Sequence, residues 1–192
     1  MQSGHHPINI IEVLLRIQNG DRQAFALIVK EFERPLFGFL GRMGLTQGLA
    51  EDLAQETFLR AWKSLGQYEP TRGAFSTWLF TIARNLAFNE LDRASYLNEI
   101  QEEEGTSEQA CAEPQPPESL ALAQRKQRLR NALWQLPAAE RSTVALAYVK
   151  ELELAEVARI EGCSIGAVKT RLHRARRRLS QFLEKDDVRQ SG

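Results

Sequence analysis

Residues 154–179, LAEVARIEGCSIGAVKTRLHRARRRL, predict two helices joined by a tight turn. Gly162 can adopt the left-handed backbone conformation that such a turn requires, and Ser164 is a typical N-cap for the following helix. Apolar residues recur at helical spacing on both sides of the turn, and we expect these to be buried: Leu154, Val157, Ala158 and Ile160 before it, and Ile165, Val168, Leu172 and Leu179 after it. The rest of the second helix is strongly basic. The pattern favours a DNA-binding helix-turn-helix over the alternative, a solvated basic helix packed on its neighbour.

The charges are segregated along the chain, although the formal net charge is zero. Residues 8–96 carry 10 basic and 10 acidic side chains, whereas residues 97–118 carry 7 acidic and no basic ones. Residues 119–192 carry 15 basic and 8 acidic side chains, a net charge of +7. This last segment can gain affinity for DNA by counterion release, while the neutral first segment needs another reason to bind a partner.

Composition restricts the class of protein. A chain of 192 residues with 43% hydrophobic content can bury one ordinary core or two small ones. No apolar run approaches the roughly 20 residues of a membrane span, and the N-terminus lacks the layout of a signal peptide. We therefore expect a cytoplasmic protein that does not insert into a membrane. His5, His6, Cys111 and Cys163 form no metal-binding motif, so we expect no metal and no cofactor.

The fold class follows from the periodicity on either side of residues 97–118. This segment has a run of glutamates, three of the seven prolines and few large apolar side chains, so we interpret it as a flexible acidic linker. The flanking segments show helical spacing and almost no alternation. We predict an all-α protein with two small domains, residues 1–96 and 119–192, the second containing the helix-turn-helix. Before that motif, helices are expected up to Asn19, from Asp21, and at about 35–43, 49–65, 75–93, 119–136 and 137–150.

Two helices of the first domain carry polar residues of interest. In the helix at 49–65, Asp52, Gln55 and Glu56 should be exposed on one side, and the expected core residues are Leu53, Phe58, Leu59 and Trp62. The carboxylates have an alternative role, which is to stabilise the helix dipole. In the helix at 75–93, the expected core residues are Phe75, Trp78, Leu79, Ile82 and Leu86, and the residues left for solvent or a ligand are Arg84, Asn85 and Asn89. Because asparagine is a poor helix former, this last group indicates recognition.

Four motifs in register resemble the bacterial extracytoplasmic-function (ECF) sigma factors of the sigma-70 family. They are GDRQAFALIVKEF, AEDLAQETFLRAW, FSTWLFTIARNLAFNELDR and LPAAERSTVALAYVKELELAEVARIEGCSIGAVKTRLHRARRRL, and the resemblance spans nearly all of residues 8–183. It implies that residues 1–96 are sigma region 2, which binds the beta-prime clamp helices of core RNA polymerase and opens the −10 element. It further implies that residues 119–192 are region 4, which reads the −35 element and contacts the beta flap. The sequence of the promoter is not implied, because members differ most in the loop at 66–73 and on the recognition helix.

The resemblance assigns candidate residues to each contact. Core polymerase would be bound by Asp52, Gln55 and Glu56. The −10 element would be bound by Gln67, Tyr68, Thr71, Arg72, Arg84, Asn85 and Asn89, with a flipped base held near the loop and Asn85; Tyr68 has the alternative role of covering the local core. The −35 bases would lie near Thr170, Arg171, His173 and Arg174, with Arg171 and Arg174 projecting from the face opposite the apolar stripe. Phosphates would be held by Lys169, Arg176, Arg177 and Arg178.

The predicted function is that of an alternative sigma factor, for a stress or envelope response. The family implies an anti-sigma factor, often membrane-anchored. The acidic linker either follows a basic channel of the polymerase or serves only as a solubilising tether. A dimeric operator-binding regulator is disfavoured because the chain lacks a coiled-coil seam, and an enzyme is disfavoured because no phosphate loop, HExxH motif or carboxylate with a His or Lys partner is found.

Overall fold

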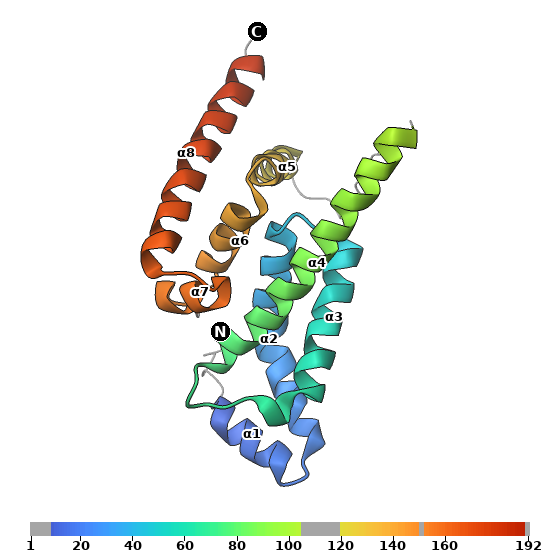
Figure 1. Cartoon of the computed structure of the whole chain (residues 1–192), viewed down its shortest axis with the longest axis vertical. Coiled ribbons are helices and arrows are strands. Elements are labelled where there is room, and N and C mark those ends of the chain that lie inside the picture. Colours follow the sequence, from blue (N-terminus) through green and yellow to red (C-terminus); the bar gives the residue numbers. More distant parts are fainter. Residues whose placement is uncertain (1–8, 105–119, 150–151, 191–192) are drawn as a thin grey trace.

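The computed structural model describes residues 9–104, 120–149 and 152–190, and within these ranges the regular structure is helical (Figure 1). The first module consists of α1 (Ile10–Gln18), η1 (Arg22–Ala24), α2 (Phe25–Arg42), α3 (Gln47–Lys63), η2 (Leu65–Gln67) and α4 (Phe75–Glu104), where η denotes a short 3₁₀ turn. The second consists of α5 (Leu120–Trp134), α6 (Ala138–Ala147), α7 (Leu154–Glu161) and α8 (Ile165–Gln190). The expected all-α architecture is confirmed. None of the described helices is long and apolar enough to cross a bilayer.

Side-chain caps start several helices of the first module. Asp21 Oδ1 accepts a hydrogen bond from the N–H of Ala24 at 3.2 Å, and Thr46 Oγ1 accepts one from the N–H of Leu49 at 3.4 Å. The Arg16 guanidinium also donates to Asp21 at 2.7 Å, and this hydrogen bond lowers the pKa of Asp21 below its ordinary value. The sequence predicted the cap at Asp21 but not the one at Thr46, so α3 begins two residues earlier than expected.

The helices expected before and after Pro35 are one continuous helix, α2, so the predicted break there is wrong. An interior proline costs a helix about 3 kcal/mol. Burial of a large apolar side chain contributes about 1.5–3 kcal/mol, and α2 buries Ile28, Phe32, Leu36, Phe39 and Leu40 along one stripe. The stripe runs through the proline without a change of phase, so the packing outweighs the local penalty.

The helix expected to end at Arg93 continues to Glu104 as α4. Residues 97–104 of the predicted linker are therefore helical, while residues 105–118 lie outside the described ranges, as do His5, His6 and Cys111. The segment NEIQEEE consists mostly of residues that accept a helix readily, and Gly105 is the first strong helix breaker after it. The many charged residues of this segment therefore did not mark the end of the helix.

Three apolar side chains that we expected to be buried are exposed. Leu59 is 45% exposed because the buried stripe of α3 passes through Leu53, Thr57 and Ala61, and position 59 falls outside it. Leu154 and Ile165, at 38% and 45%, are the first residues of α7 and α8. A side chain in a helix covers the turn on its N-terminal side, and a first residue has no such turn.

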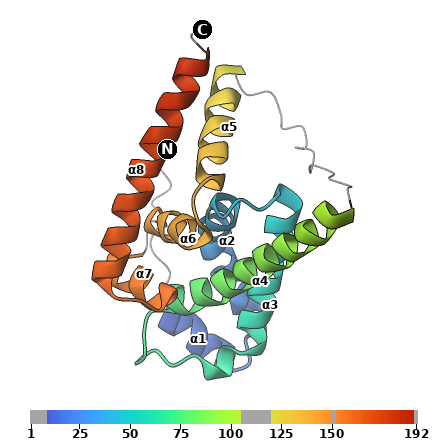
Figure 2. The same ribbon diagram turned by 45° about the horizontal axis from the view of Figure 1, so that its top comes forward.

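The two modules pack against each other through two pairs of helices. α6 lies against α2, and α7 lies against α4 (Figures 1 and 2). Buried side chains of both modules form one continuous apolar cluster, which includes Phe39 and Leu79 from the first and Leu146 and Val157 from the second. Trp134, at the end of α5, lies so close to Gly44 that a Cβ at position 44 would be 2.7 Å from its Cε2.

Replacement of Gly44 by alanine should lower the free energy of unfolding more than Gly20→Ala does. Both glycines have positive φ, 87° and 98°, so either substitution strains the backbone by about 1–2 kcal/mol. Only the Cβ at position 44 would also meet a ring of the other module, and such overpacking costs about 1–3 kcal/mol. Chemical denaturation measures both. Gly48→Ala in α3, where φ is not positive and nothing lies within 4 Å of the new Cβ, is the control free of both costs, and it should be slightly stabilising because alanine favours the helix. Equal losses for Gly44→Ala and Gly20→Ala would contradict the contribution of the Trp134 contact.

Candidate nucleic-acid interface

The turn between α7 and α8 has the predicted geometry. Gly162 is left-handed, with φ 61° and ψ 36°. Ser164 Oγ accepts a hydrogen bond from the N–H of Ala167 at 3.1 Å and so caps α8. The start of α7 is fixed by a reciprocal capping box between Glu153 and Glu156. At the end of α7, the N–H of Cys163 donates to the carbonyl oxygen of Ala158 at 3.0 Å. Because this bond and the Ser164 cap hold both ends of the turn, the direction of α8 relative to α7 is well defined.

Most of the residues predicted to bind the −35 element lie on the exposed side of α8. Val168 and Ala175 are fully buried beneath the helix, and Leu172 and Leu179 are partly buried. The exposed candidates are Lys169, Thr170, His173, Arg174, Arg176, Arg177 and Arg178. Arg178 already has an anionic partner, Glu140, whose Oε2 lies 3.4 Å from its Nε. The other exposed cations of this face can contact phosphates without first breaking an ion pair that the structure records.

The sequence predicted that Arg171 projects from the face opposite the buried stripe, and this prediction is wrong. It lies three residues after Val168 and four before Ala175, at the edge of the stripe itself. Its Nη1 donates to Glu161 Oε2 at 3.1 Å. In this conformation Arg171 is held at the junction of α7 and α8, and Arg174 remains the exposed arginine among the predicted base-reading residues.

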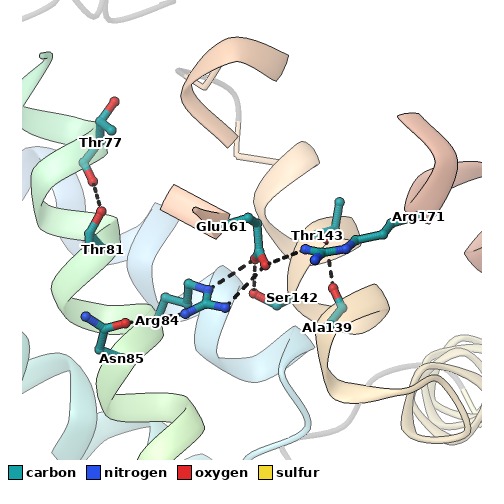
Figure 3. A network of polar contacts seen from close by, with 9 residues as sticks. All are labelled: Thr77, Thr81, Arg84, Asn85, Ala139, Ser142, Thr143, Glu161 and Arg171. Atoms are coloured by element: carbon teal, nitrogen blue, oxygen red, sulfur yellow. Dashed lines mark hydrogen bonds and ion pairs between the residues drawn. The ribbon is translucent and has the colours of Figure 1, made fainter. Parts of the chain in front are cut away.

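Glu161 collects partners from three helices, which we call the Glu161 network: Ser142 of α6, Arg171 of α8 and Arg84 of α4 (Figure 3). The carboxylate is fully buried, and Ser142 Oγ donates to its Oε1 at 2.5 Å. Arg84 contributes Nε at 3.4 Å from Oε1 and Nη2 at 3.4 Å from Oε2. A buried carboxylate needs such partners, because desolvation of an unpaired charge costs several kcal/mol.

The sequence analysis gave Glu161 no role, although a signal for it was present. Glu161 lies four residues after Val157, and Val157 was placed on the buried side of α7. A carboxylate at i+4 from a buried residue lies on the same face and must find a partner there.

The predicted −10 residues are spread along α4 and the loop before it. Gln67, Thr71 and Arg72 are exposed on the loop, and Asn85 and Asn89 are exposed on α4. Ten residues of helix, from Phe75 to Asn85, correspond to about 15 Å along the axis. Arg84 is only 21% exposed, lies 4.3 Å from the ring centre of Phe88 and donates to Asn85 Oδ1 at 3.4 Å. The role of the loop and Asn85 in holding a flipped base therefore stays a prediction.

Tyr68 covers the local core, which was one of the two roles considered for it. Its ring packs edge-on against Phe75, with centroids 5.2 Å apart, and lies 5.4 Å from Trp78. Its hydroxyl donates to the carbonyl oxygen of Gly73 at 3.1 Å and closes the loop. Burial raises the pKa of Tyr68 above its ordinary value, so the hydroxyl stays a donor near neutral pH.

The predicted polymerase-binding residues lie on the outer side of α3. Asp52 and Gln55 are exposed, as expected. Glu56 is half-buried and pairs with Arg60, whose Nε lies 2.7 Å from its Oε1. Of these two carboxylates, Asp52 is therefore the more accessible to a partner.

The structure adds a cleft beside the loop that the sequence did not indicate. It has a volume of about 600 Å³ and lies between α1, the end of α3 and the loop, with Trp62, Leu65 and Tyr68 among its lining residues. Ile11 and Leu15, which also line it, are 58% and 54% exposed. Short α1 has more apolar residues than one stripe can bury.

Comparison with known proteins identifies both modules. Residues 28–96 match the family Sigma-70 region 2, and residues 126–179 match the family Sigma-70, region 4. The chain is 33% identical over 175 residues to the ECF RNA polymerase sigma factor SigW of Bacillus subtilis, which covers 88% of this chain and 93% of SigW. It is 34% identical over 169 residues to the RNA polymerase sigma factor CarQ of Myxococcus xanthus, covering 88% and 94%. The chain belongs to the ECF sigma factors.

A solved structure shows the same fold in another sigma factor. The sigma factor RpoE of Bartonella quintana, crystallised with the anti-sigma factor NepR, aligns with a TM-score of 0.67 and 29% identity over 83% of this chain and 96% of RpoE. The protein is thus an alternative sigma factor that directs transcription initiation. The acidic side of α3 and the −10 candidates lie in the region 2 match, and all of the −35 candidates lie in the region 4 match.

In this sigma factor, Tyr68→Phe should lower the free energy of unfolding by about 0.5–1.5 kcal/mol, the usual net contribution of one hydrogen bond. The ring contacts with Phe75 and Trp78 remain in this variant, and only the bond to the Gly73 carbonyl is lost. Tyr68→Ala removes both and should cost clearly more. Urea denaturation of the two variants measures the difference. Equal losses would mean that the ring packing does not stabilise the loop.

Proposed function

We propose that this sigma factor divides promoter recognition between the exposed face of α8, which reads the −35 element, and the loop at 66–73 with α4, which captures the −10 element. The observation that carries the proposal is the helix-turn-helix with its exposed cationic face. Arg174, His173 and Thr170 lie on that face toward the start of α8, where a helix in a major groove meets base edges. Arg176 and Arg177 follow on the same surface and suit phosphate contacts.

Capture of the −10 element is supported by the exposed polar residues of the first module. Gln67, Thr71 and Arg72 on the loop and Asn85 and Asn89 on α4 are all accessible to a single strand. An amide side chain can pair with the edge of an unstacked base, and arginine can contact the backbone. Tyr68 supports this surface from below by closing the loop on the core.

We further propose that Asp52, Gln55 and Glu56 bind the beta-prime clamp helices of core RNA polymerase and that the second module contacts the beta flap. Support for the first contact is the exposure of Asp52 and Gln55 on the outer side of α3. The relative from Bartonella quintana is bound to an anti-sigma factor, and we propose that such a factor also controls this chain. Membrane anchoring of that factor, a role in a stress or envelope response, and action in the cytoplasm remain predictions.

Run-off transcription with core RNA polymerase on fragments of the source genome tests the function. The sigma factor should direct initiation at specific start sites and bind free promoter DNA only weakly without core. Tight binding of the chain alone to a palindromic operator would instead indicate a dimeric regulator, and it would overturn the proposal.

Charge reversal at Asp52 should weaken binding to core polymerase without loss of fold. Asp52→Lys changes an exposed carboxylate, whereas Glu56→Lys also breaks the pair with Arg60, which contributes about 0.3–0.5 kcal/mol. Co-purification with core and thermal denaturation measure the two effects. Glu33→Lys, at an exposed position of α2, is the matched control. Undiminished co-purification of Asp52→Lys would contradict a contact between Asp52 and core polymerase.

Arg174→Ala and Arg177→Ala should impair −35 binding in different ways. Loss of a bidentate contact from Arg174 to a guanine costs about 1–3 kcal/mol and relaxes preference at one base pair. Loss of a phosphate contact from Arg177 should weaken all −35 sequences alike and reduce the salt slope by about one unit. Binding of reconstituted holoenzyme to single-base −35 variants at several salt concentrations distinguishes them. If Arg174→Ala weakens every variant equally, Arg174 contacts only the backbone.

A further inference from the structure

Within the Glu161 network, two contacts lie inside the second module and one joins the two modules. Ser142 Oγ and Arg171 Nη1, at 2.5 and 3.1 Å from the carboxylate, belong to the same module as Glu161. Arg84 comes from the first module, and both of its contacts with the carboxylate are 3.4 Å long. The contact between the modules is thus the longest of the network, and Glu161 keeps two partners when it is lost.

A second carboxylate of α7 also binds α4. Glu156 Oε1 accepts a hydrogen bond from Thr77 Oγ1 at 2.9 Å, and its Oε2 accepts one from the N–H of Glu153 at 2.9 Å within α7. Glu156 therefore keeps its capping bond when α4 moves away. Ser76 Oγ also donates to Glu156 Oε1, at 3.5 Å. When these polar contacts between α4 and α7 are lost, water can solvate Ser76, Thr77 and Arg84 on one side, and the capped Glu156 and the paired Glu161 on the other.

The position of Arg84 and Arg171 on one carboxylate conflicts with promoter binding. Under the proposed function, Arg84 belongs to the −10 surface and Arg171 to the recognition helix. The two promoter elements lie about 25 base pairs apart, roughly 85 Å along the duplex at about 3.4 Å per base pair. Two arginines that contact the same carboxylate cannot be at both elements, so this conformation cannot engage the promoter.

We propose that Glu161 of region 4 holds the free sigma factor in a closed, DNA-incompetent conformation through its contact with Arg84 of region 2, while Ser142 and Arg171 of its own module keep the buried carboxylate paired. Opening releases Arg84 for the −10 element. Glu161 contacts no DNA in this scheme, and its role is to set the balance between closed and open conformations. The inference rests on the proposed function, because that function gives the two modules their separate targets.

Distance measurements in the full chain test the proposal. Spin labels are placed at Glu33→Cys on α2 and Gln181→Cys on α8, both exposed positions, with Cys111 and Cys163 replaced by serine. Double electron–electron resonance should give one short distance in the free chain and a longer one after addition of core polymerase and promoter. Glu161→Gln retains an acceptor for Ser142 but removes the charge, and it should raise the ratio of long to short distances about fivefold or more.

Three further variants separate the contact between modules from the rest. Arg84→Gln should open the chain as Glu161→Gln does, and the double variant should open it no further, because both changes remove the same contact. Glu140→Gln removes another buried carboxylate that pairs with an α8 arginine, Arg178, but has no partner from the first module among the described contacts. It should leave the distances unchanged, as should Arg171→Gln.

The outcomes are distinct from those of the function test. Unchanged distances in both Glu161→Gln and Arg84→Gln would overturn the proposal, as would an additive effect in the double variant. Arg84 is partly exposed, so Arg84→Gln decides the question if Glu161→Gln does not fold. Run-off transcription by the unmodified chain is scored separately. Its failure, together with a normal shift from short to long distances in the Glu161 variant, would refute the proposed function and leave the closure intact.

Discussion

The arrangement of the second module depends on one requirement, the need to pair the buried carboxylate of Glu161. Helix α7 is short and buries Val157, Ala158 and Ile160, and the helical repeat carries Glu161 to the same side. Burial of an unpaired carboxylate would cost several kcal/mol. α6 supplies a hydroxyl, α8 an arginine and α4 a second arginine, so one charge connects four helices. These contacts orient the four helices together with the apolar packing between them.

The same arrangement separates residues for binding from residues for structure on a single helix. On α8, Val168 and Ala175 face the core, Arg171 faces the junction with α7, and Arg174 faces solvent. The net charge of +7 over residues 119–192 therefore overstates the cations available to DNA. Arg171 and Arg178 have carboxylate partners in the folded chain, and a phosphate must compete with those partners before it can bind.

Local sequence patterns correctly predicted the features that are determined by residues close together in the chain. Gly162 and Ser164 gave the turn, Asp21 gave a helix start, and the helical spacing gave the all-α class, because caps and periodicity act within one or two turns. The predictions failed where distant residues decide. The continuity of α2 through Pro35 depends on packing against other helices, and the position of Arg171 depends on the buried carboxylate of Glu161 on the preceding helix. The roles of the predicted contact residues in polymerase and DNA binding remain predictions.

The close approach of Trp134 to Gly44 limits which sequences can replace this one. Position 44 excludes a side chain for two independent reasons, its φ of 87° and the ring at 2.7 Å from a Cβ. A smaller residue at position 134 would relieve the second restriction but not the first, and it would also remove the ring on which the Arg141 guanidinium lies, 4.7 Å from the centroid. No single compensating substitution therefore restores tolerance at position 44. Divergence of the loop after α2 is tied to the end of α5, about 90 residues later in the chain, so the two segments must change together.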